Sequence, residues 1–96
     1  MSAYLVGLVE VTDPSWLAEY SKKVKVQLAN VGAKYHVRST KIESLEGDKP
    51  TPMSITIIEF PSMEVAREWY KTDEYQALVE LRKGGATADF WLTESI

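Results

Sequence analysis

The stretch Met53-Ser54-Ile55-Thr56-Ile57-Ile58-Glu59-Phe60-Pro61-Ser62 marks a passage from a strand to a helix. Its run of β-branched residues, Ile55–Ile58, favours an extended backbone, because branched side chains lose rotamer freedom in a helix. Pro61 and Ser62 then open a helix, since serine is a preferred N-cap residue. We therefore expect a strand over Met53–Phe60 that leads directly into a helix.

Outward from this stretch, the chain alternates strand-like and helix-like segments. Runs rich in Val, Leu and Tyr predict strands, and apolar residues three and four positions apart predict helices. The predicted elements are strands over Ala3–Val11, Lys34–Leu45 and Ala88–Glu94, a helix capped by Asp13 that runs from Pro14 to Val31, and a helix from Ser62 to Arg82 that breaks near Lys71.

The resulting order, β-α-β-β-α-β, predicts a single α+β domain of the ferredoxin-like type over residues 1–96. In this topology the four strands form an antiparallel sheet of order 4-1-3-2, and both helices cover one face. Alternation along the strands leaves Tyr4, Val6 and Leu8, together with Ile55 and Ile57, on the face without helices. Such an apolar face predicts a partner, and two sheets packed face to face would form a two-fold dimer.

Composition excludes several functional classes. The 96 residues carry a net charge of −3, which disfavours binding to nucleic-acid phosphates. There is no cysteine, so no disulfide framework, thiolate metal site or cysteine nucleophile is available. The N-terminal segment has no basic start, and its apolar run Ala3–Val9 is too short to cross a membrane. We expect a cytoplasmic protein with no membrane or nucleic-acid partner.

Several short motifs in this order resemble one protein family, the domain-of-unknown-function family 1330 of the dimeric α/β-barrel superfamily. The resemblance implies a ferredoxin-like homodimer with a barrel between the two sheets, and it implies no particular reaction. It rests on Ala3-Tyr4, Thr12-Asp13-Pro14, Tyr20, Gly32-Ala33, Val37-Arg38, Leu45-Glu46-Gly47, Ile58-Glu59-Phe60-Pro61-Ser62, Trp69-Tyr70, Glu74-Tyr75-Gln76-Ala77-Leu78 and Leu81-Arg82.

Polar residues on the face without helices are the candidate catalytic groups. Alternation places His36 and Arg38 there with Glu59, and a hairpin turning within residues 46–52 would set Arg38 nearly opposite Glu59. Such a pair is either a structural ion pair or an arginine that holds an organic acid beside a proton-carrying glutamate. We expect Tyr4 and Trp91 to line the same pocket.

Aromatic residues of the second helical region, Trp69 among them, have the spacing of core residues and could line a pocket between helix and sheet. One histidine without cysteine supplies too few ligands for a metal site, and no cofactor is predicted. Two functions fit the sequence. The first is a homodimer that binds a small acidic or aromatic molecule in the barrel, as a binder or as a cofactor-independent enzyme of isomerase or monooxygenase type. The second is a non-catalytic sensing or structural module with a filled barrel.

Overall fold

The computed structural model describes all residues, 1–96, and its centre is an antiparallel sheet of four strands. The strand order is β2-β3-β1-β4, which is the predicted order read from the other edge. The strands are β1 (Ala3–Val11), β2 (Lys34–Ser39), β3 (Ser54–Phe60) and β4 (Ala86–Glu94). The α+β ferredoxin-like prediction is therefore confirmed.

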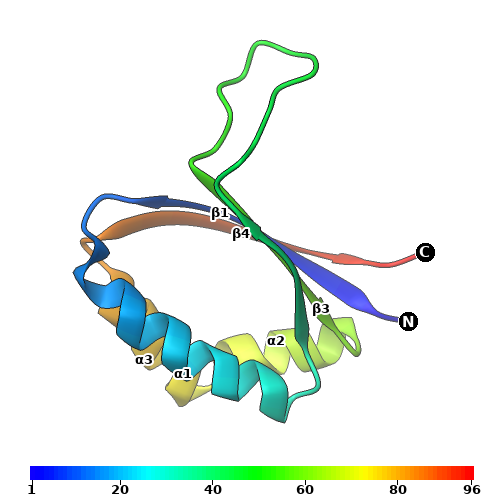
Figure 1. Ribbon diagram of the computed structural model, residues 1–96. Helices are drawn as coiled ribbons and strands as arrows, with labels where there is room; N and C mark the ends of the chain where they lie inside the picture. Colours follow the sequence, from blue (N-terminus) through cyan, green and yellow to red (C-terminus); the bar gives the residue numbers. More distant parts are fainter.

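All helices lie on one side of the sheet, and the sheet curves around them (Figure 1). The opposite face, here called the open face, carries no helix. The loop of residues 40–53, between β2 and β3, projects away from the helices and ends far from the rest of the molecule (Figure 1). Leu45 in this loop is 92% exposed.

The first helical region begins as the sequence predicts, at Asp13, whose carboxylate accepts a hydrogen bond from the Ser15 amide at 3.0 Å. A short 3₁₀ turn, η1 (Pro14–Trp16), precedes α1 (Leu17–Asn30). Trp16 is buried, and its indole Nε1 donates a hydrogen bond to the Gly85 carbonyl at 3.2 Å. This contact ties the start of α1 to the start of β4.

The second helical region is interrupted where the sequence predicts a break. α2 (Met63–Lys71) is capped by Ser62, whose hydroxyl accepts from the Val65 amide. α3 (Asp73–Arg82) is capped by Thr72, whose hydroxyl accepts from the Tyr75 amide. Each cap satisfies an amide that has no partner within its own helix.

The core lies between the sheet and the helices and is rich in aromatic rings. Phe60, Trp69 and Tyr75 pack together, with 4.1 Å between the ring centroids of Trp69 and Tyr75. Gly7 faces Phe90 across the β1–β4 pair, and a methyl group on Gly7 would lie 2.7 Å from the Phe90 ring. Glycine at this position therefore leaves the space that the Phe90 ring occupies.

Three strand boundaries differ from the sequence-based prediction, and one of these differences is a single residue, since β3 begins at Ser54 and not at Met53. β2 ends at Ser39 rather than Leu45, because only residues up to Ser39 find partners on β3. β4 begins at Ala86, two residues earlier than expected, where it pairs with Val11. No helix in the structure has the length and apolar character needed to span a bilayer.

Candidate ligand-binding site

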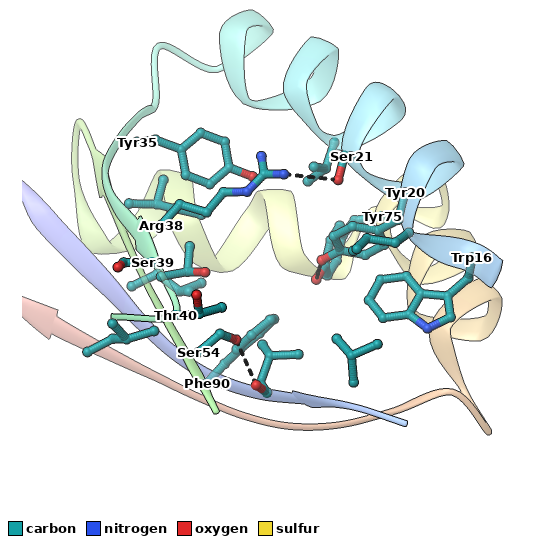
Figure 2. Close-up of a pocket in the computed structure, with 18 of the residues that line it drawn as sticks. Trp16, Tyr20, Ser21, Tyr35, Arg38, Ser39, Thr40, Ser54, Tyr75 and Phe90 are labelled. Carbon is teal, nitrogen blue, oxygen red and sulfur yellow. Dashed lines mark hydrogen bonds between the residues drawn. The ribbon is translucent and has the colours of Figure 1, made fainter. Parts of the chain in front are cut away.

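A cavity of about 330 Å³ lies between the sheet and α1. We call it the helix–sheet cavity. Most of its lining residues are hydrophobic, and they come from β1, α1, β3 and the helices on the same side. Figure 2 shows Tyr35 and Arg38 on one side of this cavity and Trp16 on the other. Its volume is at the lower end of the range for small-molecule sites.

Two phenols from different helices meet at the wall of the cavity. The hydroxyl oxygens of Tyr20, on α1, and Tyr75, on α3, lie 2.7 Å apart and share a hydrogen bond (Figure 2). Burial raises the pKa of Tyr20 strongly, and the neighbouring Tyr75 hydroxyl raises it further. Tyr20 therefore keeps its proton at neutral pH and acts as a hydrogen-bond donor or acceptor.

Arg82 follows the phenol pair at the end of α3. Burial works against its charge, but the Tyr75 and Tyr20 hydroxyls outweigh that effect and raise the pKa of Arg82. A charged guanidinium therefore lies beside the two phenols and over the Phe90 ring, and it is not part of the lining of the helix–sheet cavity.

A second polar group faces the cavity from β2. The Nη2 of Arg38 donates a hydrogen bond to the Ser21 hydroxyl at 3.3 Å, and its guanidinium carbon lies 5.7 Å from the centre of the Tyr35 ring. Burial raises the pKa of Tyr35, although the charge of Arg38 opposes that change. Arg38 itself is exposed, so it stands where the cavity meets solvent.

The predicted pairing of Arg38 with Glu59 is wrong. Tyr35 faces Ile58 and Val37 faces Ile57, so two steps along β2 correspond to one step along β3. His36 is the extra residue of this β-bulge, which reverses the alternation beyond it. Arg38 is consequently opposite Thr56 and points toward the helices, whereas Glu59 belongs to the open face.

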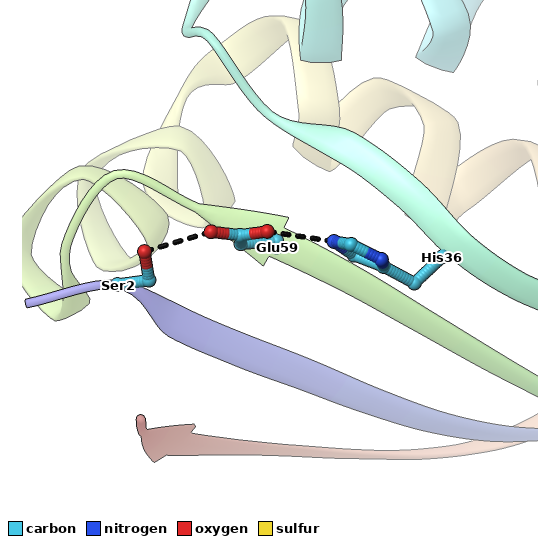
Figure 3. Close-up of polar contacts among 3 residues, drawn as sticks. All are labelled: Ser2, His36 and Glu59. Atoms are coloured by element: carbon cyan, nitrogen blue, oxygen red, sulfur yellow. Dashed lines mark hydrogen bonds and ion pairs between the residues drawn. The ribbon is translucent and has the colours of Figure 1, made fainter. Parts of the chain in front are cut away.

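Glu59 instead joins His36 and Ser2 in a polar cluster on the open face (Figure 3). His36 Nε2 and Glu59 Oε1 lie 2.6 Å apart, and the Ser2 hydroxyl donates to Glu59 Oε2 at 2.7 Å. The hydrogen bonds from Ser2 and His36 lower the pKa of Glu59. Because Glu59 stands between the other two, the serine has no contact with the histidine and is not arranged as a nucleophile with its base.

The predicted pocket aromatics fall on opposite sides of the sheet. Tyr4 is on the open face, with 5.8 Å between the centres of its ring and the His36 ring. Trp91 faces Val6 in the β1–β4 pair and is 57% exposed. Trp69 is buried on the helix side and lines the helix–sheet cavity. The sequence-based set therefore does not form one site.

The sequence gives Tyr75 the spacing of a core residue that could line a pocket between helix and sheet, and it places Tyr20 on the apolar stripe of the first helix, but it does not connect the two. The signal was a tyrosine within an otherwise aliphatic helical stripe, because a buried phenol needs a hydrogen-bond partner. No group of three or more His, Cys, Asp or Glu side chains is placed to hold a metal ion.

Comparison with solved structures defines this chain as a ferredoxin-like protein. A protein of unknown function from Rhodopseudomonas palustris, RPA0582, superposes with a TM-score of 0.79 at 16% identity, over 99% of this chain and 82% of the other. SnoaB, a cofactor-independent oxygenase from Streptomyces nogalater, gives 0.66 at 10% identity, over 99% and 93% of the two chains. A dimeric ferredoxin-like protein of unknown function from Bacteroides fragilis gives 0.63 at 10% identity, over 98% and 96%.

The family follows from the sequence itself. The model for the domain of unknown function DUF1330 matches residues 2–96, and the chain belongs to that family. No curated protein matches the chain. The family's description assigns no function.

Proposed function

We propose that this protein binds a small, mainly apolar organic molecule with oxygen substituents in the helix–sheet cavity. The observation that carries the proposal is the phenol pair of Tyr20 and Tyr75, which presents polar groups to a cavity with otherwise mostly hydrophobic walls. An aromatic body would fill the apolar volume, and a carbonyl or hydroxyl oxygen would accept a hydrogen bond from the pair.

Arg38 supplies the second point of recognition in this proposal. Its guanidinium stands at the solvent side of the cavity and has only the neutral Ser21 hydroxyl as a side-chain hydrogen-bond partner. A carboxylate or phenolate at that end of the ligand would form a stronger, charge-assisted hydrogen bond with it. The favoured ligand is therefore aromatic and carries an acidic group at one end.

Binding is favoured over turnover because the cavity lining holds no carboxylate and no imidazole. A keto–enol isomerisation needs a group that accepts a proton, and Glu59 and His36 lie on the other side of the sheet. The oxygenase SnoaB shares the fold, and a fold hosts many functions. Its activity supports testing each ligand for turnover and oxygen uptake as well as for binding.

We also propose that the protein is a homodimer formed through the open face. That face carries Val6, Leu8, Ile55 and Ile57 with no helix over them, and two of the structural neighbours are dimeric. The loop of residues 40–53 projects on the same side and would lie against the second copy (Figure 1). In such a dimer, His36 and Glu59 would lie at the edge of the interface and would have a structural role, not a catalytic one.

A thermal-shift screen of aromatic acids and their neutral amides tests the binding proposal, since a ligand of the native state raises the melting temperature. A hit should lose affinity in Tyr75→Phe and in Arg38→Met, and it should keep affinity in Lys25→Met, an exposed α1 residue outside the cavity. Equal affinity for all three variants would overturn the assignment of the site.

A further inference from the structure

A second cavity, of about 360 Å³, lies beneath the edge strand β4, between this strand and the α2–α3 pair. We call it the β4 pocket. Leu5 and Phe90 line both this pocket and the helix–sheet cavity, so their side chains form the partition between the two. The β4 pocket is on the helix side of the sheet and would stay open in a dimer formed through the open face.

The polar lining of the β4 pocket is strongly cationic. Arg67, Lys71 and Arg82 all line it, and no aspartate or glutamate does. Arg67 and Lys71 are four residues apart on α2 and therefore share one side of that helix. A positive pocket on a chain of net charge −3 attracts anions locally.

None of these three cations has an ion-pair partner. The side-chain ion pairs within 4.0 Å join Lys23 to Glu19, His36 to Glu59 and Lys83 to Glu80. No internal ion pair therefore has to break before these cations meet an anionic ligand, although Arg82 also lies beside the Tyr20 and Tyr75 hydroxyls.

Arg82 adds a buried donor without an acceptor. Its Nε is inaccessible to solvent and has no hydrogen-bond partner in the protein. Arg82 nevertheless lines the pocket, and the other N–H groups of a guanidinium match the two oxygens of a carboxylate. The guanidinium carbon lies 5.1 Å from the centre of the Phe90 ring, so the aromatic wall helps to hold the group at this depth.

The remainder of the pocket suits an apolar body. Leu5, Ala66, Phe90 and Leu92 contribute its walls, and Tyr70 lines it at 39% exposure. We propose that the β4 pocket binds a small amphipathic organic acid, with its carboxylate toward Arg82, Arg67 and Lys71 and its apolar body against Phe90 and Leu92. The volume fits a small acid better than a long-chain lipid.

Titration of the full chain with 4-phenylbutyrate, followed by backbone amide NMR, tests this proposal. We expect saturable shifts in residues 66–71 and 88–92, and affinity that falls as salt is added. The neutral analogue 4-phenylbutan-1-ol should bind at least about tenfold more weakly, which is the effect of losing about 1.4 kcal/mol of charge-assisted binding. Equal affinity for acid and alcohol, or no saturation at millimolar acid, would overturn the proposal.

A matched pair of double variants separates the pocket from general charge. Arg67→Met with Lys71→Met should weaken phenylbutyrate binding at least about tenfold. Lys22→Met with Lys25→Met removes the same charge from α1 and should leave binding unchanged. All four residues are exposed, so both proteins should fold, and unchanged melting temperatures would confirm it.

The single variant Arg38→Met distinguishes the two cavities. It should leave phenylbutyrate shifts at residues 88–92 intact, because Arg38 lines only the helix–sheet cavity. Loss of those shifts in Arg38→Met, or equal weakening in the two double variants, would show that the acid does not bind in the β4 pocket.

Discussion

Tyr20 and Tyr75 stand 55 residues apart in the chain, and their hydroxyl oxygens are 2.7 Å apart in the fold. The bond joins α1 to α3 across the wall of the helix–sheet cavity. Tyr75 is fully buried and Tyr20 half-buried, so the pair belongs to the core and to the candidate site at once. Changes to either phenol should therefore affect both stability and ligand binding.

Tyr75→Phe should lower the free energy of unfolding by about 1 kcal/mol, because it leaves the Tyr20 hydroxyl without its partner in a largely desolvated place. Tyr20→Phe should cost a similar amount. The double variant should cost less than the sum of the two, because the second change removes a group that has already lost its bond. Denaturant unfolding of the three proteins measures this coupling. Tyr70→Phe is the control, and additive single effects would contradict a shared bond.

The raised pKa of Tyr20 predicts a loss of stability in alkali. Above about pH 10 an unfolded tyrosine releases its proton, whereas folded Tyr20 retains it. The folded state then binds more protons than the unfolded state, so the free energy of unfolding falls as pH rises, by up to about 1.4 kcal/mol per pH unit. Tyr20→Phe should flatten this decline between about pH 9.5 and 11. An identical slope in wild type and variant would contradict the burial of this phenol.

The lowered pKa of Glu59 predicts the opposite dependence in acid. Its charged form is stabilised in the fold by Ser2 and His36, so this contribution is present above the ordinary carboxyl range and is lost as pH falls through it. Glu59→Gln should reduce the fall in melting temperature between about pH 5 and 3. Glu10→Gln, an exposed residue of β1, is the matched control. A variant that tracks wild type over this range would show that the cluster contributes nothing to stability.

Ile57→Lys should prevent dimerisation, because it places a charge among the apolar residues of the open face. Sedimentation of wild type at micromolar concentration should give about twice the 10.8 kDa mass of one chain, and the variant should sediment as a monomer. Leu45→Ser should weaken the dimer less, since it alters only the projecting loop. Lys25→Glu, on α1, should have no effect. A monomeric wild-type protein would refute the proposed interface.

Gly7→Ala should destabilise the fold by about 1–3 kcal/mol, since the added methyl would overlap the Phe90 ring. The partner substitution Phe90→Leu should restore part of that loss in the double variant, because the smaller side chain makes room. Thermal unfolding of the single and double variants measures the rescue. No rescue would mean that the strain lies in the backbone of β1 instead.

Most of the fold could be predicted because its signals are local. Asp13 and Ser62 cap helices where the sequence places caps, and the second helical region breaks near Lys71 as expected. The β-branched run of β3 pairs with β1 as its alternation requires. These features depend on neighbours within a few residues, where propensity and periodicity carry information.

The site could not be predicted, because one extra residue reversed the alternation of β2. His36 bulges between Tyr35 and Val37, and no glycine or proline marks the place. Each β2 side chain after the bulge lies on the opposite face of the sheet from the one that simple alternation predicts. Arg38 therefore lines the helix–sheet cavity and does not lie on the open face. The hydrogen bond between Tyr20 and Tyr75 could not be predicted either, because it joins two helices whose relative position is defined only by tertiary packing.

The pairing of β1 with β4 has a consequence for how the chain folds during synthesis. β1 is bonded to β4 along its whole length, from Ala3 opposite Glu94 to Val11 opposite Ala86. Once residues 1–60 of a nascent chain have left the ribosome, β1 can pair with β3. The other edge of β1 stays unpaired until β4 has been synthesised. During that interval the unpaired edge can capture a second nascent chain, so the last strand both completes the sheet and protects it from aggregation.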